Sequence, residues 1–249
     1  MDTRFWGPDG WKLLHSIARG FPDNPTKNQK DAYCLFFTCL KHILPCIYCR
    51  NSYTQYIREL PLTDKYLKDN KTLSLWIYKI HNKVNNKLRK QGLLNEDDPK
   101  FSEIFERYTE FNRKIEESNC KCSFPGWDFM HCVVFNFPLK ECGIEVIRQT
   151  NYIIFFSLLS EVIPFQPLKK LINDYICKND LYSAITGRIA LKKWLYGMEK
   201  SVLNELNVEC LTYRERCERI ENNRAGCGSK KDKKPTCRKS RKSNKNNIK

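Results

Sequence analysis

The chain of 249 residues is 41% hydrophobic and 29% charged, and its formal net charge is +16; this length allows one large domain or two small ones. The longest apolar run, residues 152–163, is much shorter than the ~20 residues that cross a bilayer and contains Glu161, so a membrane span is excluded. No basic stretch followed by an apolar one opens the chain, and we expect a soluble, intracellular protein without a secretory signal.

Proline and glycine divide the first part of the chain into amphipathic segments, each predicted to be a helix. Gly7 and Pro8 open the first segment, and the second runs from about residue 27 to residue 44. Pro45 ends the second helix, because the residue before a proline is pushed out of the helical region. A third helix then begins at the cysteine pair and ends near residue 59, and residues 71–90 form a fourth. This pattern predicts an all-α protein built on a four-helix bundle.

The remaining chain is predicted to hold one more bundle helix, a second module and a tail. Residues 100–118 have helical periodicity, whereas "FPGWDF" at 124–129 and "FNFPL" at 135–139 indicate loops. Residues 144–212 turn helical again, with breaks at Pro164, at Pro167 and near Asn179. We therefore divide the chain into a bundle at 1–118, a mainly helical C-terminal module at 119–212 and a basic tail at 213–249.

The tail carries most of the surplus charge. Residues 213–249 contain 14 Lys and Arg against 4 Asp and Glu, a net charge of +10, and few large apolar residues. Such a segment cannot bury a core and is predicted to be disordered. It could hold nucleic acid or another acidic partner by neutralising phosphates, and the alternative is a tail that only improves solubility.

The segment "LPCIYC" contains the first candidate for chemistry. Cys46 and Cys49 would lie one turn apart at the start of a helix, where the positive end of the helix dipole favours thiolates. The chain has 13 cysteines, and in a reducing compartment paired cysteines usually serve redox catalysis or metal binding. The pair is therefore either a redox dithiol or half of a zinc site. "CKC" at 120–122 and "HC" at 131–132 could complete a zinc site, but their spacing is not that of a usual zinc module.

Polar side chains on the apolar stripes of the bundle indicate a cofactor site. His81 and Asn85 are one turn apart beside Val84 on the fourth helix, and His15 interrupts the apolar face of the first. Buried polar groups are costly unless they bind something, and bundles build cofactor sites from inward-facing side chains. No GxGxxG or Walker motif is present, so a Rossmann-type site is not expected.

Three ordered motifs resemble one known family. "WGPDGWKLLHSIA", "LPCIYC" and "WIYKIHNKVNNKLRK" follow one another as they do in the Erv/ALR family of FAD-dependent sulfhydryl oxidases, and the resemblance covers residues 4–105. The tail and the added module are most similar to versions from large DNA viruses of the mimivirus type, which implies the host cytoplasm or the virion as the location.

The resemblance implies a FAD-linked thiol oxidase that forms disulfides in protein substrates. Electrons would pass from a substrate dithiol through Cys46, the outer cysteine, and Cys49, the flavin-proximal thiolate, to FAD and then to oxygen, giving hydrogen peroxide. The resemblance also implies a homodimer paired through the first helices. It assigns a larger set of residues to FAD: Arg4, Gly7, Trp11, His15, Tyr53, Trp76, His81, Asn82, Val84, Asn85 and Lys90, of which Trp76 has packing in the core as its alternative.

Some features depart from the family pattern or stay open. Cellular members follow the fourth helix with a cysteine that staples a short fifth helix, whereas this chain reads "RKQGLLNEDDPKF". Family members also use a second, mobile cysteine pair as a shuttle, for which Cys120 and Cys122 are the candidates; a structural disulfide to Cys132 or Cys142 is the alternative.

A function from another class competes with the oxidase. The rival is a non-enzymatic helical scaffold, held by zinc, with a basic arm that binds nucleic acid. The oxidase interpretation expects no metal.

Overall fold

The computed structural model describes residues 1–121, 124–138 and 143–224, and of residues 143–145 it describes the backbone only. The described residues form helices and no strand. The helices of the bundle are α1 (Thr3–Arg19), α2 (Lys27–Ile43), α3 (Ile47–Glu59), α4 (Asn70–Lys90) and α5 (Phe101–Glu117). The helices after the bundle are α6 (Trp127–Phe135), α7 (Gly143–Val162), α8 (Gln166–Lys178), α9 (Leu181–Ala184), α10 (Arg188–Glu205) and α11 (Tyr213–Asn222). The predicted all-α fold and its bundle are confirmed.

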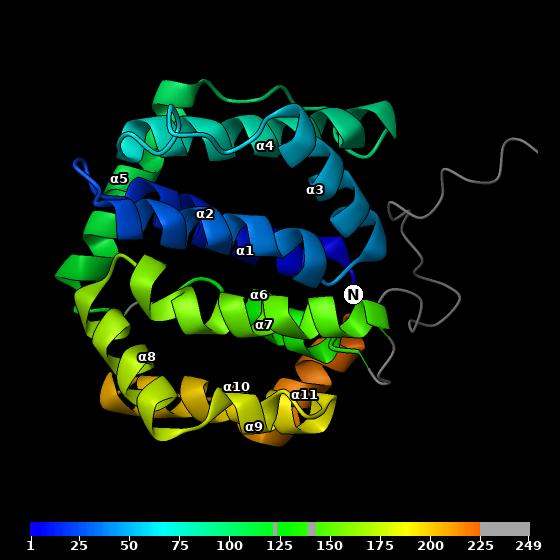
Figure 1. Ribbon diagram of the computed structural model, residues 1–249, viewed down its shortest axis with the longest axis vertical. Helices are drawn as coiled ribbons and strands as arrows, with labels where there is room; N and C mark the ends of the chain where they lie inside the picture. Colours follow the sequence, from blue (N-terminus) through cyan, green and yellow to red (C-terminus); the bar gives the residue numbers. More distant parts are fainter. Residues whose placement is uncertain (122–123, 139–142, 225–249) are drawn as a thin grey trace, which may run out of the picture.

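The helices are stacked in layers, as Figure 1 shows. α3 and α4 lie above α1 and α2, α6 and α7 lie below them, and α8 to α11 form the far layer. One continuous hydrophobic core runs from α1 through α7 to α10. The core is thus continuous across the boundary expected near residue 118, and the division into domains stays a prediction.

The helix boundaries follow the expected breakers with one exception. Leu44 leaves the helical region just before Pro45, and Pro167 lies in the first turn of α8, both as predicted. α1, in contrast, begins at Thr3, and Pro8 lies inside it. The side chain of Asp2 accepts a hydrogen bond from the Arg4 amide and caps this helix. The cap starts the helix earlier than the proline alone suggests.

The segment that was expected to be irregular contains α6. The prediction of a loop at 124–129 is wrong from Trp127 onward, since the helix starts there. The α6 residues Trp127 and Phe129–Phe135 are buried, so the helix has no polar face and lacks the periodicity by which amphipathic helices are recognised. α6 packs against α1 so closely that a Cβ atom at Gly10 would come within 2.9 Å of the Phe129 ring.

The C-terminal module covers the outward sides of the first two helices. α6 packs on α1, and α7 lies along α2 in the opposite direction. The Phe36 and Phe155 rings stack at 5.1 Å, and the Tyr33 hydroxyl donates to the Val162 carbonyl over 3.1 Å. These contacts cover part of the surface of α1 and α2, and a homodimer through the first helices stays a prediction.

Helix α11 occupies residues that were expected to be a disordered arm. That expectation is wrong for residues 213–224, and residues 225–249 lie outside the described part of the chain. Arg216 is only 7% exposed and donates to the buried carboxylate of Glu199 and, at 2.7 Å, to Asp128. Burial alone would raise the pKa of Glu199, but His131 and Arg216 lower it, so the carboxylate stays ionised. A fixed anion inside the module therefore holds α11 in place.

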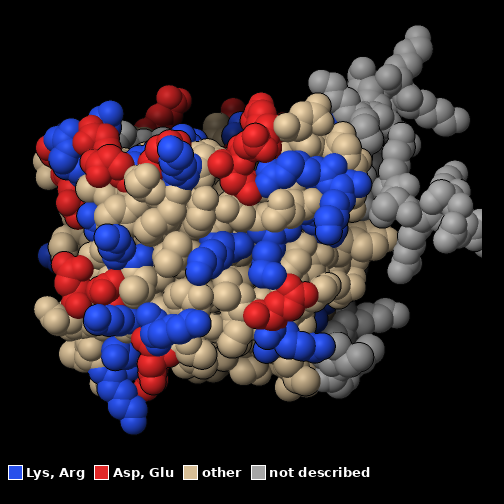
Figure 2. Space-filling model, turned by 90° about the horizontal axis from the view of Figure 1, so that it is seen from above, with Lys and Arg blue, Asp and Glu red and all other residues tan. Residues whose placement is uncertain are grey.

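The surface charges of the described body are mixed in sign. On the face drawn in Figure 2, Lys and Arg side chains alternate with Asp and Glu. Residues 1–212 carry 30 Lys and Arg against 24 Asp and Glu, a net charge of +6.

No helix among the described residues has the length and apolarity needed to span a membrane.

Replacing Arg216 should destabilise the module strongly. The change Arg216→Ala leaves the Glu199 carboxylate buried without its guanidinium, and breaking a buried ion pair in this way costs about 3–5 kcal/mol of unfolding free energy. Urea denaturation measures the loss. Arg214→Ala on the same helix is the control, because its pair with Glu218 is exposed, and this variant should unfold almost as the parent does. Equal stability of the two variants would contradict the role of Arg216.

Candidate functional site

The two cysteines of the CxxC motif lie at the N-terminus of α3, as predicted. Cys46 is the N-cap residue with extended backbone angles (φ −132°, ψ 128°), and Cys49 is the third residue of the helix. Both side chains are half-buried. The first backbone amides of a helix have no partner within the helix and carry its positive dipole end. A thiolate at either position is therefore stabilised by the backbone itself.

Arg50 adds a positive charge next to the two sulfur atoms. One guanidinium nitrogen donates to the Leu44 carbonyl over 2.6 Å, which ties the side chain back across the turn between α2 and α3. Burial and the nearby charge of Arg148 lower the pKa of Arg50, while the electrostatic interaction with Cys46 and Cys49 opposes that shift. The dithiol thus has a helix N-terminus and a tethered cation beside it.

A cavity of about 550 Å³ opens on the side of α3 that carries Cys49. Its size is in the range of small-molecule and cofactor pockets, and its walls are mostly apolar and aromatic. The cavity lies between α1, α3 and α4, with further lining from Tyr108 of α5 and Phe129 of α6. Eight of the residues predicted for the site line this cavity: Arg4, Gly7, Trp11, Cys49, Tyr53, His81, Val84 and Asn85.

Other predicted residues lie outside the cavity lining. Trp76 is 1% exposed, donates from its indole to the Leu60 carbonyl over 3.0 Å and belongs to the core. His15 is buried behind His81, while Asn82 and Lys90 lie on α4 away from the lining. The predicted residues thus divide into a set that lines one cavity and a set that lies behind or beside that lining, and their roles stay predictions.

The two histidines form a stacked aromatic column with their neighbours. His15 Nε2 lies 3.0 Å from His81 Nδ1, so one ring donates a hydrogen bond to the other. Trp11 stacks on His81 at 3.9 Å, and Tyr108 stacks on His15 at 4.7 Å. Burial lowers the pKa of His15 to about 3 and that of His81 to about 4. Both rings are therefore neutral near pH 7, and the column presents flat, uncharged surfaces to the cavity.

Glycine keeps one wall of the cavity flat. Gly7 lines the cavity, and a Cβ atom at this position would project into open space with no atom within 4 Å. The side chain of any larger residue would enter that space. Lys12 and Lys87 also line the cavity and can pair with negative charges of a ligand. The Lys87 amine donates to the Ser52 hydroxyl over 2.8 Å. The cavity thus combines flat apolar surfaces with cations.

Hydrogen bonds and an ion pair hold the segment after α4, where the family pattern would have a cysteine staple. Asp98 accepts from the Asn85 amide over 2.7 Å and pairs with Arg89 at 2.5 Å. The Tyr78 hydroxyl donates to the Pro99 carbonyl over 2.8 Å. Asp98 was not predicted from the sequence, because it reaches Asn85 from the segment after α4, which has no regular periodicity. Asn85 is in turn held at the edge of the cavity.

Tyr108 and Phe129 line the cavity and were not predicted from the sequence. Tyr108 belonged to the apolar stripe of the predicted helix 100–118, and nothing in that stripe distinguishes it from core. Phe129 comes from the C-terminal module, which the family motifs do not reach. The module therefore contributes directly to the cavity.

The predicted shuttle cysteines are only partly described. Cys120 is 1% exposed, and its sulfur would have to move to meet a substrate. Cys122 and Cys142 lie outside the described residues. Cys39 donates to the Phe36 carbonyl inside the core, where burial raises the pKa of its thiol.

The residues proposed for a zinc site do not gather in the described part of the chain. His131 Nε2 lies 2.8 Å from the Glu199 carboxylate, and burial raises the pKa of Cys132 to about 12. Among residues 1–121, 124–138 and 143–224, no three His, Cys, Asp or Glu side chains are arranged to hold a metal ion. The scaffold interpretation therefore finds no support in this region.

Comparison with known proteins points to the same part of the chain. A family model described as "Erv1 / Alr family" matches residues 8–108, which include the dithiol and most of the cavity lining. A probable FAD-linked sulfhydryl oxidase of Acanthamoeba polyphaga mimivirus is 40% identical over 85 residues, covering 34% of this chain and 59% of the relative. The mitochondrial FAD-linked sulfhydryl oxidase of Saccharomyces cerevisiae is 38% identical over 89 residues, covering 36% and 46%.

A further viral relative is matched over more of its length. The FAD-linked sulfhydryl oxidase of African swine fever virus is 34% identical over 86 residues, covering 34% of this chain and 70% of the relative. The chain thus spans only about half the length of the first two relatives and more than two thirds of the third.

Acid should weaken the fold through the histidine column. The folded protein keeps His15 and His81 neutral, whereas the unfolded chain protonates them below the usual histidine pKa of 6.5. Stability is therefore full above pH 6.5 and falls as the pH drops toward 4, by about 2 kcal/mol for each histidine at pH 5. Urea denaturation at pH 7.5 and pH 5 checks this. His81→Gln, which keeps a hydrogen-bond partner for His15, should lose about 2 kcal/mol less between the two pH values, and an unchanged loss would contradict the assignment.

Proposed function

The chain belongs to the Erv1 / Alr family, and on that premise we propose that it is a FAD-linked sulfhydryl oxidase that forms disulfide bonds in protein substrates. One observation carries the proposal. Cys49 of a dithiol at a helix N-terminus lines a cavity of cofactor size, whose walls are the helices that hold the family motifs. A dithiol that trades two electrons needs an acceptor next to it, and the cavity provides the space for one.

The residues of the cavity fit FAD. Trp11, His81 and Tyr108 offer aromatic surfaces for a planar ring system, and the open space at Gly7 admits a flat group against α1. Lys12 and Lys87 can neutralise a diphosphate, and Arg4 adds a third cation to the lining. The residues that would hold FAD are therefore Arg4, Gly7, Trp11, Tyr53, His81, Val84 and Asn85 of the predicted set, with the neutral His15 fixing the orientation of His81.

The reaction begins at Cys46. A substrate thiolate attacks the Cys46 sulfur of a Cys46–Cys49 disulfide, which forms a mixed disulfide with Cys46 and releases Cys49 as a thiolate. The second substrate thiol, after losing its proton, attacks the substrate sulfur of the mixed disulfide; the substrate leaves oxidised and Cys46 leaves as a thiolate. The helix N-terminus and Arg50 stabilise the thiolates that leave in each step, which speeds exchange.

The electrons leave the dithiol through Cys49. FAD, when bound, supplies the acceptor of two electrons and can pass them to oxygen. In sum one dithiol and one oxygen molecule give one disulfide and one hydrogen peroxide, so that the two protons and two electrons lost by the thiols are found in peroxide. Cys49 is the cysteine of the pair that lines the cavity, and it is the residue placed to pass the electrons on and to regenerate the disulfide with Cys46.

The other parts of the chain suggest partners and location. Relatives from mimivirus and African swine fever virus lead us to propose a virus-encoded enzyme that acts in the host cytoplasm or the virion. Because the surplus charge of the chain lies in residues 213–249, that segment is the candidate for binding nucleic acid. Cys120 and Cys122 stay candidates for a shuttle, with the burial of Cys120 as an obstacle.

Removing the Cys49 sulfur should separate cofactor binding from oxidation. Cys49→Ser changes one atom in a large cavity, so the variant should keep its FAD, but it lacks the thiolate that passes electrons on. Oxygen uptake with dithiothreitol should fall to background. Cys34→Ser on α2 is the matched control and should keep the parent rate, because Cys34 lies outside the cavity lining. Undiminished oxygen uptake by Cys49→Ser would refute the proposed function.

A further inference from the structure

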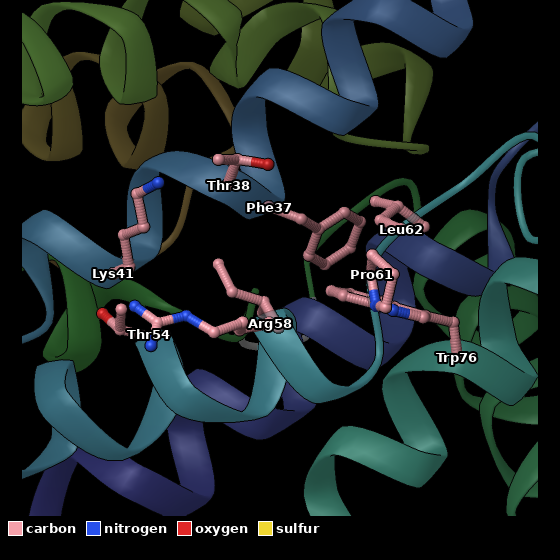
Figure 3. A pocket seen from close by; sticks show the side chains of 9 residues that line it. Phe37, Thr38, Lys41, Thr54, Arg58, Pro61, Leu62 and Trp76 are labelled. Atoms are coloured by element: carbon pink, nitrogen blue, oxygen red, sulfur yellow. The ribbon is translucent and has the colours of Figure 1, made fainter.

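Helix α3 borders a second cavity on its other side. Thr54, Ile57 and Arg58 face a groove of about 350 Å³, whereas Cys49, Ser52 and Tyr53 face the larger cavity. The groove lies in the crease between α2 and α3 and is closed by the turn after α3, as Figure 3 shows. The remaining lining residues are Phe37, Thr38, Lys41, Pro61, Leu62 and Trp76.

The groove has a cationic end and an apolar end. In Figure 3, Lys41 and Thr54 lie at one end, and the Arg58 guanidinium points toward Thr54. Phe37, Pro61, Leu62 and Trp76 gather at the other end. Phe37 and Trp76 are 0% and 1% exposed and lie beneath this end, so its accessible apolar surface comes from Ile57, Pro61 and Leu62. Such a site fits a ligand that carries an anionic group and a hydrophobic group a few ångströms apart.

The positive charges at the cationic end have no acidic partner in the described chain. Lys41 and Arg58 take part in none of the ion pairs or side-chain hydrogen bonds among residues 1–121, 124–138 and 143–224. The nearest acidic neighbour in sequence, Glu59, is engaged elsewhere, since its carboxylate accepts from Lys83 at 2.6 Å and from Gln55 at 2.7 Å. Two unmatched cations beside an apolar surface favour an acidic partner from outside the chain.

The groove is connected to the dithiol by helix geometry. Cys46, Arg50, Thr54 and Arg58 follow one another at intervals of four residues, so that each lies one turn from the next along α3. From Cys46 to Thr54 the helix rises ~12 Å, which an extended peptide covers in about four residues at 3.3 Å each. A polypeptide whose cysteine meets Cys46 can thus reach the groove with the residues that follow.

We propose that this groove binds the substrate segment about four residues from the reacting cysteine, with an acidic side chain between Lys41 and Arg58 and an apolar side chain against Pro61 and Leu62. The proposal rests on the proposed oxidase function and adds a substrate class to it: protein dithiols flanked by an acidic and hydrophobic segment. Small dithiols such as dithiothreitol do not reach the groove. The groove therefore governs the choice of protein substrate and leaves the exchange chemistry at Cys46 unchanged.

Charge reversal in the groove tests the proposal by kinetics. The substrates are dithiothreitol and two peptides that each contain a cysteine pair. Both peptides carry a Phe four positions after the pair, beside two Glu residues in the acidic peptide and two Lys residues in the basic one. Lys41→Glu/Arg58→Glu should lower kcat/KM for the acidic peptide by about 10-fold or more, because unlike charges become like charges. It should raise the value for the basic peptide and leave dithiothreitol oxidation within about 2-fold. Lys193→Glu/Lys200→Glu, with two exposed lysines of α10 and the same change in net charge, is the control and should resemble the parent.

A binding measurement keeps this test independent of the oxidase activity. The acidic peptide, with both cysteines replaced by serine and a fluorophore attached, is titrated with parent and variant proteins and followed by anisotropy. Weaker binding to the charge-reversed groove, with normal binding to the control, supports the groove even if the protein oxidises no thiol. Equal peptide kinetics and binding in parent and charge-reversed protein would overturn the proposal, as would an equal loss of dithiothreitol and peptide oxidation. Competition by free acetate or phosphate alone, without dependence on the peptide's phenylalanine, would assign the groove to small anions and also overturn it.

Discussion

The end of α2 just before Pro45 is the constraint on which the site depends. A proline disfavours the helical conformation in the residue before it, and here Leu44 turns extended and α2 ends. The next residue, Cys46, is already the N-cap of α3. A turn this short places the dithiol at a helix N-terminus, brings Arg50 back to the Leu44 carbonyl and fixes α3 against α2. The two sides of α3 then border two cavities. One is lined by Cys49, and the other is lined by Thr54 and Arg58, which follow Cys46 along the helix at multiples of four residues.

Helix α1 connects this site to the rest of the molecule. One side of α1 supplies Gly7, Trp11 and His15 to the cavity or its support. Its other side packs on α6, where the Asp9 carboxylate accepts hydrogen bonds from the amides of Gly126 and Phe129 over 2.9 Å and 3.0 Å. Burial raises the pKa of Asp9, which these two donors oppose. The C-terminal module is thus bound to the bundle by the same helix that forms the cavity wall.

The bundle and part of the cavity could be predicted from local signals, whereas Arg4, Gly7, Trp11 and Tyr53 were assigned only by the family resemblance. A proline break, an apolar stripe at helical spacing and a polar residue one turn from the next are all readable within ten to twenty residues. His81 and Asn85 are examples, since two polar side chains one turn apart on the apolar stripe of a helix indicate a pocket from the sequence alone.

The errors arise where burial depends on distant residues. α6 is wholly buried and so has no alternation to read. α11 is rich in charge and reads as tail, yet Arg216 is buried by Glu199 and by Asp128, which is 88 residues away in sequence. His15 was identified as a site residue but acts behind His81, because only the folded structure shows which ring meets the cavity. Trp76 was an ambiguous case for the same reason.

FAD in the cavity beside Cys49 would lie against Gly7. The most direct measurement is the absorbance spectrum of the purified full-length protein and of Gly7→Leu, whose side chain would occupy the open space at that wall of the cavity. The parent should be yellow, with a flavin spectrum that corresponds to one FAD per chain. Gly7→Leu should be folded by circular dichroism and largely colourless, while Gly187→Leu, at an open position at the start of α10, should keep its flavin. A colourless parent, or a Gly7→Leu variant with full flavin, would contradict the account.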